Sequence, residues 1–157
     1  MRVIRSILII LVVSLALSVM PAFSQQDSRI GVGFGKPNYV LIYRPGNFDF
    51  KGGYDFTEGN EFVYLSGGYR FVDNRHLNGP LHFSLGIGGF GRFSFGDASS
   101  METITGGMQL PVGMSVMVFD RFLEFFVEVA PGIDLYPRPG FADVPLQAWA
   151  GVTLQVN

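Results

Sequence analysis

The sequence of 157 residues contains no cysteine. A scaffold held together by disulfide bonds is therefore excluded, and stability must come from burial, strand pairing or a bilayer. The two histidines, His76 and His82, do not make a metal site without cysteine ligands beside them. We therefore expect neither a metal ion nor a cofactor.

Basic residues are also scarce, with 11 Lys and Arg against 13 Asp and Glu. Two of them, Arg2 and Arg5, precede an apolar run over residues 7–20, which is followed by Pro21 and the sequence Ala-Phe-Ser at 22–24. The run is shorter than the about 20 residues of a membrane-spanning helix. This pattern predicts a secretory signal peptide over residues 1–24 and one mature domain over residues 25–157.

Removing Arg2 and Arg5 from the 11 basic residues leaves nine against 13 acidic ones in the mature chain. Nucleic-acid binding needs a basic surface for phosphate contacts, and this composition does not supply one. We therefore expect no nucleic-acid partner.

Helical periodicity is missing after residue 25, whereas glycine (21 residues) and phenylalanine (16 residues) are abundant. Apolar and polar residues instead alternate with a period of two between turn-forming clusters, which is typical of strands. The predicted strands are residues 29–35, 39–43, 47–56, 61–71, 81–95, 107–118, 123–135 and 144–156. This pattern predicts an all-β fold, an eight-stranded antiparallel up-and-down barrel. The longest connection is expected over residues 72–80.

The clearest pair of strands is 107–118 with 123–135. If Asp120 and Arg121 form the centre of a tight hairpin, the numbers of paired residues sum to 241, so that Val118 faces Leu123. The apolar residues of both strands then lie on one side, and the small and polar residues lie on the other. Pro111 and Pro131 fall at adjacent levels, which predicts one shared interruption of the ladder.

The polar face of the predicted barrel is rich in glycine and serine and carries charges of both signs. Its charged members are Arg29, Asp49, Lys51, Asp55, Arg70, Arg92, Glu124, Glu128 and Asp134. Small residues beside a nearly balanced set of ions are typical of the close-packed interior of a small barrel, where charges must be paired. We therefore predict an ion network in the lumen and an apolar exterior, as in a transmembrane barrel.

The alternative is a soluble exported barrel similar to a lipocalin, with the apolar face inward around a small apolar ligand. The short first two strands and the lack of an aromatic residue in the last four positions, 154–157, favour this alternative. The choice between the two barrels decides which face meets water.

Three blocks carry a family resemblance: GVGFGKP at 31–37, LPVGM at 110–114 and FLEFFVEVAPGIDLYP at 122–137. With them the chain resembles a family of small bacterial outer-membrane β-barrels first recognised in spirochaetes, similar in architecture to the OmpA and OmpX transmembrane domains. The resemblance implies an eight-stranded outer-membrane barrel and supplies no catalytic residues. We therefore expect outer-membrane lipid and, during insertion, the barrel assembly machinery as partners, and a monomeric protein.

Three motifs suggest chemistry, and each has a simpler explanation. The G-x-G-x-x-G match at residues 86–91 lies inside a strand, where no helix follows to bind a nucleotide. Glu124 and Glu128 are about 13 Å apart on a strand, too far for an acid/base pair. His82 with Ser84 suggests a lipid hydrolase but lacks a matched carboxylate. We therefore predict a non-enzymatic, structural barrel with a plugged or very narrow lumen, whose short loops contact lipopolysaccharide or a surface partner.

Overall fold

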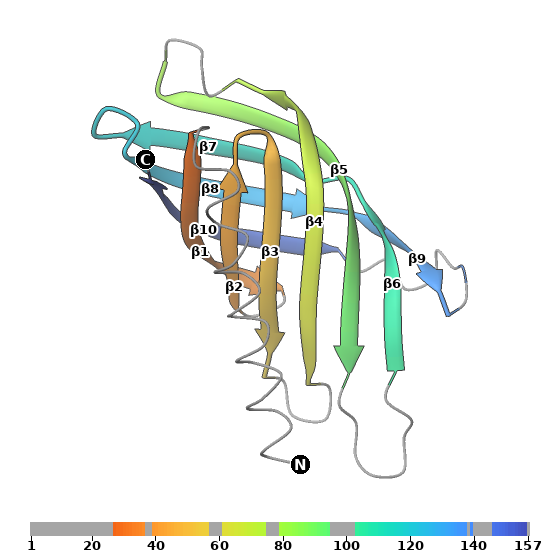
Figure 1. Ribbon diagram of the computed structural model, residues 1–157. Helices are drawn as coiled ribbons and strands as arrows, with labels where there is room; N and C mark the ends of the chain where they lie inside the picture. The colour runs from red at the N-terminus through yellow and green to blue at the C-terminus, as the bar shows by residue number, and fades with distance from the viewer. Residues whose placement is uncertain are drawn as a thin grey trace.

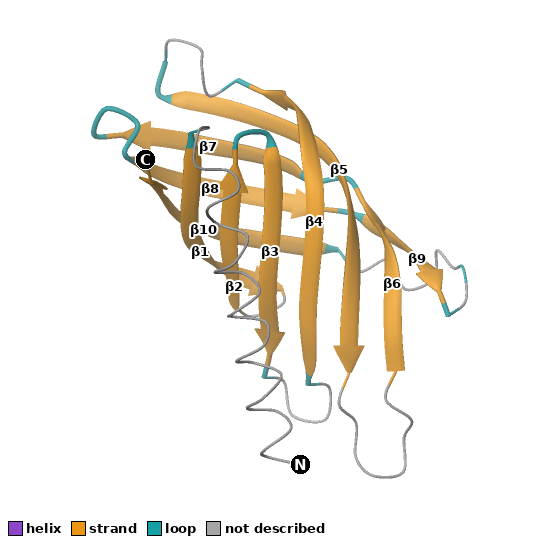
Figure 2. Cartoon of the chain, in the orientation of Figure 1, coloured by secondary structure: helices purple, strands orange, loops and turns teal. Residues whose placement is uncertain are grey.

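The computed structural model describes residues 27–36, 39–56, 61–74, 79–94, 103–137, 139 and 146–156. The predicted signal peptide, His76 and parts of several connections lie outside these residues. Every regular element of the described chain is a strand (Figures 1 and 2). Within these residues, no helix has both the length and the apolar character needed to cross a membrane. The predicted all-β fold is confirmed.

Ten strands make up the sheet. They are β1 (Ser28–Lys36), β2 (Tyr39–Pro45), β3 (Phe48–Asp55), β4 (Phe62–Asp73), β5 (Leu81–Ser94), β6 (Thr103–Gln109), β7 (Val112–Val118), β8 (Leu123–Ala130), β9 (Gly132–Tyr136) and β10 (Gln147–Val156). The pairs are antiparallel, and their order is β4-β3-β2-β1-β10-β8-β7-β5-β6-β9, with β4 also paired to β5. Since β1 pairs with β10 and β4 with β5, the sheet closes on itself.

The ten strands occupy eight positions around the barrel. β6 and β7 are two parts of one long strand that is interrupted at Leu110 and Pro111, and β8 and β9 are two parts of another that is interrupted at Pro131. Each proline lacks a backbone N–H and so cannot complete the ladder. The backbone N–H of Leu110 donates to the carbonyl of Pro131 at 2.9 Å, which keeps the two strands joined across the gap. The eight-stranded barrel and the shared interruption are both as predicted.

The register of the central hairpin is also confirmed. Val118 pairs with Leu123, Met117 with Glu124 and Val112 with Val129. The two central turn residues, Asp120 and Arg121, have φ values of 52° and 72°, as a primed hairpin turn requires.

The apolar face of the sheet points outward. Exposed large apolar residues include Val32, Phe34, Leu41, Phe71, Phe83, Met114, Phe125, Val127 and Leu154. Buried polar and charged residues include Arg29, Arg44, Asp49, Lys51, Asp55, Arg70, His82, Gln109, Glu124, Glu128, Gln147 and Thr153. This orientation is the reverse of the one that a lipocalin-like barrel requires.

Four predicted boundaries were wrong by two or more residues. The strand predicted from residue 107 begins at Thr103, and the strand predicted from residue 144 begins at Gln147. The second strand continues through Arg44 to Pro45 instead of turning there, and the fourth continues to Asp73. The fourth strand contains a β-bulge between Arg70 and Val72, where the register with β5 shifts. The expected longest connection, 72–80, is therefore shortened to 74–80, and the connections 95–102 and 137–146 are both longer.

The two ends of the barrel differ in their connections. One end, called the terminal end here, carries Ser28 of β1, Val156 of β10 and the connections 46–47, 74–80 and 119–122. The opposite end, called the distal end, carries the connections 37–38, 56–61, 95–102 and 137–146. The longest connections therefore lie opposite the two ends of the barrel domain.

Replacing Asp120 with glycine is expected to stabilise the barrel by about 0.5–1 kcal/mol, because a left-handed backbone is unfavourable for a residue with a side chain and Asp120 is exposed. The gain is measured as an increased free energy of unfolding in urea, followed by the fluorescence of the single tryptophan, Trp149. Phe122 has no positive φ, so the matched variant Phe122→Gly should show no gain. Equal effects of the two substitutions would contradict this reading of the turn.

Candidate functional site

The most distinctive group of side chains lies inside the barrel, in its half towards the terminal end. Arg29 of β1, Arg44 of β2, Asp49 and Lys51 of β3, and Glu124 and Glu128 of β8 all point inward, and we call these six residues the ion cluster. Side chains on a strand alternate between its two faces, so residues whose numbers differ by two or four lie on the same face. Asp49 and Lys51 therefore both point inward, and so do Glu124 and Glu128. Each is buried, with 2–4% of its surface exposed.

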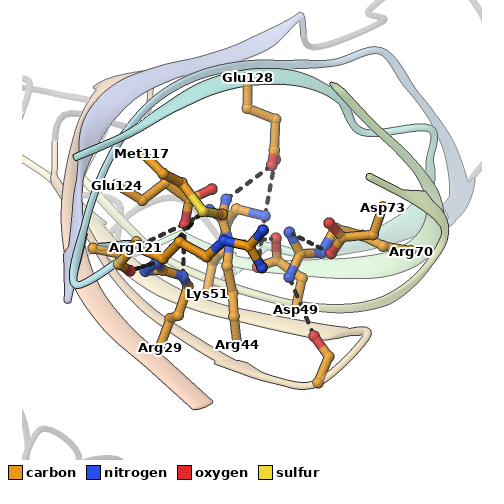
Figure 3. Close-up of polar contacts among 12 residues, drawn as sticks. Arg29, Arg44, Asp49, Lys51, Arg70, Asp73, Met117, Arg121, Glu124 and Glu128 are labelled. Atoms are coloured by element: carbon orange, nitrogen blue, oxygen red, sulfur yellow. Dashed lines mark hydrogen bonds and ion pairs between the residues drawn. The ribbon is translucent and has the colours of Figure 1, made fainter. Parts of the chain in front are cut away.

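Arg44 joins the anions of the cluster. Its Nε lies 3.0 Å from Oδ2 of Asp49, its Nη1 lies 3.6 Å from Oε2 of Glu124, and its Nη2 lies 3.2 Å from Oε2 of Glu128. The three carboxylates come from two strands on opposite parts of the wall and meet at one guanidinium (Figure 3). A planar guanidinium with five N–H donors suits this role, which a lysine ammonium cannot copy.

Lys51 and Arg29 complete the pairing. The Nζ of Lys51 lies 2.9 Å from Oδ1 of Asp49 and 2.8 Å from Oε1 of Glu128, and Nε of Arg29 lies 3.3 Å from Oε2 of Glu124. Three cations thus face three anions, and the cluster has no net charge. Charges that are removed from water need such partners, because an uncompensated buried ion costs several kcal/mol.

Neighbouring groups hold the cluster in place. The Thr153 hydroxyl donates to Oε2 of Glu124 at 2.7 Å. The guanidinium of Arg44 lies 4.6 Å from the centre of the Phe126 ring, and the Lys51 ammonium lies 5.4 Å from that of Trp149. These cation–π contacts connect the charges to the apolar part of the interior.

That apolar part fills the lumen towards the distal end. We call it the aromatic layer; its buried members are Val40, Ile42, Tyr64, Phe90, Phe126, Ala130 and Trp149. The Tyr64 ring centre lies 5.7 Å from that of Trp149 and 6.4 Å from that of Phe90. The Tyr64 hydroxyl forms hydrogen bonds with Gln109 and Gln147 at 2.9 and 2.6 Å, so its polar end is satisfied inside the barrel.

Small residues make room for this layer. Gly33 and Gly151 are direct partners on β1 and β10, and a Cβ on Gly151 would lie 2.8 Å from the Phe126 ring and would collide with the carbonyl of Val32. We therefore expect Gly151→Ala to lower the free energy of unfolding by about 1–3 kcal/mol. A Cβ on Gly89 would come no nearer than 3.6 Å to any neighbour. Urea titration of Gly89→Ala is the matched control, and equal losses would contradict the packing argument.

The other predicted members of the network make contacts of their own, and the charge of Arg70 also acts on Asp49 of the ion cluster. Arg70 forms an ion pair of 3.2 Å with Asp73. Arg92 pairs with Asp134 at 2.7 Å, and these side chains are 22% and 16% exposed. Asp55 is buried on the inner face of β3, near its distal end. The ion cluster is thus the largest group of charged residues described inside the barrel, with Arg70 and Asp73 beside it and Arg92 paired with Asp134.

Sequence reasoning missed Arg44 and Asp73. The sequence predicts a turn at Arg44 because Pro45 and Gly46 follow it, although Arg44 continues the alternation of Val40 and Ile42 on the inner face. Asp73 shares the inner face with Arg70 only because the bulge at 70–72 inserts an extra residue. Arg44 could have been predicted from the alternation of strand 39–45, whereas nothing in the sequence indicates the bulge that turns Asp73 inward.

The residues that suggested chemistry have defined polar contacts in the interior. Glu124 and Glu128 are both paired with cations. The Nδ1 of His82 lies 2.9 Å from the backbone carbonyl of Asn74, and no ion pair between a carboxylate and His82 is found among the described residues. The described chain has no group of three or more His, Cys, Asp or Glu placed to hold a metal. A cavity of about 10 Å³ beside Arg44, Ser84 and Glu128 has room for roughly one water.

Comparison with known proteins gives one match. No curated protein and no solved structure matches the chain. Residues 23–144, which include all six residues of the ion cluster, match a family described as a protein of unknown function (DUF3996). The match covers well over half of the 157 residues. The chain therefore belongs to the DUF3996 family.

Proposed function

We propose that this protein is a structural, non-enzymatic β-barrel of the bacterial outer membrane whose lumen is closed by its own side chains. The observation that carries the proposal is the orientation of the wall: buried paired ions lie inside, and large apolar side chains lie outside. In water, such an exterior would be an apolar patch far larger than soluble monomers normally expose. In a bilayer, the same wall would be in its preferred surroundings.

Aromatic residues on the exterior support a membrane location. Towards the distal end, Phe34, Tyr39 and Phe56 lie side by side, with ring centres 5.3 and 6.0 Å apart. Towards the terminal end, the rings of Phe48 and Tyr69 lie 5.4 Å apart. Between these groups the wall carries aliphatic residues and glycine, including Val32, Leu41, Gly52 and Leu65. An aliphatic band between two aromatic belts is typical of outer-membrane barrels.

The filled interior favours a structural role over that of a channel. The ion cluster and the aromatic layer are in contact inside the barrel, where the Phe126 ring lies against Arg44. An eight-stranded barrel is only wide enough for such side chains. The lipocalin-like alternative would need an apolar cavity, and the described interior instead places charges beside the small cavity at Arg44.

The sidedness follows from the connections. With a signal peptide at residues 1–24, both ends of the barrel domain would lie in the periplasm, as in the OmpA and OmpX domains that the sequence resembles. The distal end would then face outward, and its longer connections, 95–102 and 137–146, would be placed to contact lipopolysaccharide or a surface partner. The barrel assembly machinery would insert the chain as a monomer.

Fractionation and gel migration test the proposal. The expressed chain is expected to be recovered in the outer-membrane fraction and to resist extraction by alkaline carbonate. On gels, the unheated protein should migrate faster than the heated protein. Recovery as a soluble periplasmic monomer that needs no detergent would overturn the proposal. Fluorescence of an added hydrophobic dye would then test the lipocalin-like alternative.

A further inference from the structure

The turn between β7 and β8 is unusual for an exposed turn, because it is aromatic. We call residues 119–122 the hairpin tip; Phe119 is 76% exposed and Phe122 is 54% exposed. Asp120 between them is exposed as well. The other fully described turn at the terminal end, Gly46 with Asn47, carries no apolar side chain. Short hairpins normally place Asn, Asp or Gly at such positions.

The backbone of the hairpin tip is also held in an unfavourable conformation. Phe119, Asp120 and Arg121 have φ values of 52°, 52° and 72°. Positive φ is uncommon for residues other than glycine and is a clear outlier for a bulky residue such as phenylalanine. A sequence selected for turn formation alone would not place a phenylalanine there.

Neighbouring strands fix this conformation. The N–H of Phe122 donates to the carbonyl of Phe119 at 2.9 Å, and the N–H of Gln155 in β10 donates to the carbonyl of Phe122 at 2.8 Å. Arg29 in β1 donates to the carbonyl of Arg121 (Figure 3). Strain that is held in place by several contacts often marks a functional site. The tip therefore displays its two phenylalanines rigidly, beside the end of β10 (Figure 1).

The exterior on either side of the hairpin tip shows what these rings would meet. The outward-facing residues of β7 and of β8 near the tip are mostly aliphatic, including Val116, Val118 and Leu123. Elsewhere at the terminal end, the wall carries Phe48 and Tyr69. Phe125 follows Leu123 on the outer face of β8. Phe119 and Phe122 thus extend the apolar outer face of β7 and β8 beyond the ends of the two strands.

We propose that the hairpin tip is an interfacial anchor, which inserts Phe119 and Phe122 into the boundary between headgroups and acyl chains at the terminal end and so fixes the depth of the barrel. The inference rests on the proposed membrane location. Aromatic side chains are enriched at this boundary. The apolar wall continues into the tip, which favours lipid over a protein as the partner.

Depth-dependent quenching tests the anchor. In a Trp149→Phe background, single tryptophans are placed by Phe119→Trp, Phe122→Trp, Val127→Trp in the middle of β8, and Asn47→Trp in the polar turn. The variants are reconstituted into phosphatidylcholine vesicles brominated near the headgroup or deep in the acyl chain. Where Trp149→Phe lowers the folded yield, the variants retain Trp149, whose buried indole gives a constant background.

Tryptophan at position 119 or 122 should emit at a shorter wavelength than tryptophan at position 47. Its fluorescence should be quenched most strongly by lipids brominated near the headgroup. Tryptophan at 127 should be quenched most strongly by deep bromines. If the tip positions behave like position 47 while position 127 is quenched, the anchor is excluded and the membrane barrel stands. If position 127 is not quenched by any of the lipids, the proposed membrane location itself fails.

Discussion

Replacing Arg44 with methionine is expected to lower the free energy of unfolding by about 3–5 kcal/mol, because it leaves an uncompensated charge inside the barrel. Arg44 is the residue that contacts Asp49, Glu124 and Glu128 together. Without it, Lys51 and Arg29 face three carboxylates. The loss is measured by urea titration in lipid vesicles, with Trp149 fluorescence as the signal.

Two further variants isolate the cause of this loss. Arg92→Met removes the cation of a partly exposed pair, and we expect it to cost about 1 kcal/mol or less. Adding Glu128→Gln to Arg44→Met restores equal numbers of positive and negative charges in the cluster and should recover part of the stability, as non-additivity within one network predicts. If Arg44→Met costs no more than Arg92→Met, the ion cluster is not what holds the interior together.

Replacing Val127 with lysine is expected to destabilise the barrel in a bilayer by about 2–4 kcal/mol. Val127 lies on the outer face in the middle of β8 and is 57% exposed. In a membrane, the lysine would have to place its charge in hydrocarbon. In water, the same surface substitution would change the stability by only about 0.5 kcal/mol. Unfolding in vesicles and the yield of inserted protein both measure the effect.

Val156→Lys is the control for Val127→Lys, because it differs in its depth along the barrel. Val156 also faces outward but lies at the last residue of β10, at the terminal end. Val156→Lys should therefore cost about 0–1 kcal/mol, because a lysine there reaches the aqueous boundary. A barrel in which Val127→Lys is as well tolerated as Val156→Lys does not have lipid around its wall.

Much of the fold could be predicted because a strand alternates with a period of two. The alternation over 107–118 and 123–135, together with a two-residue turn, was enough to place Val112 opposite Val129 and Leu110 beside Pro131. Both relations are local, since they depend on one hairpin. The inward positions of Lys51 and Glu128 followed from the same alternation.

The contacts within the lumen were beyond such reasoning. Lys51 meets Glu128 and Arg29 meets Glu124 across the interior, between strands that are not neighbours. These pairings depend on the tilt and closure of the whole barrel, which no local pattern encodes. The position of the Arg92–Asp134 pair was equally hard to predict, because it depends on how far β5 and β9 extend towards the distal end.

The central claim is that the apolar wall meets lipid, and an accessibility scan along β8 tests it most directly. The chain lacks cysteine, so single cysteines at Phe125, Val127 and Val129 can each carry a nitroxide label, with Asn47→Cys as the aqueous reference. In vesicles, the three β8 labels should be accessible to oxygen dissolved in the acyl chains and protected from a water-soluble nickel chelate. Labels at these three positions that meet the chelate as readily as the label at position 47 would contradict the claim.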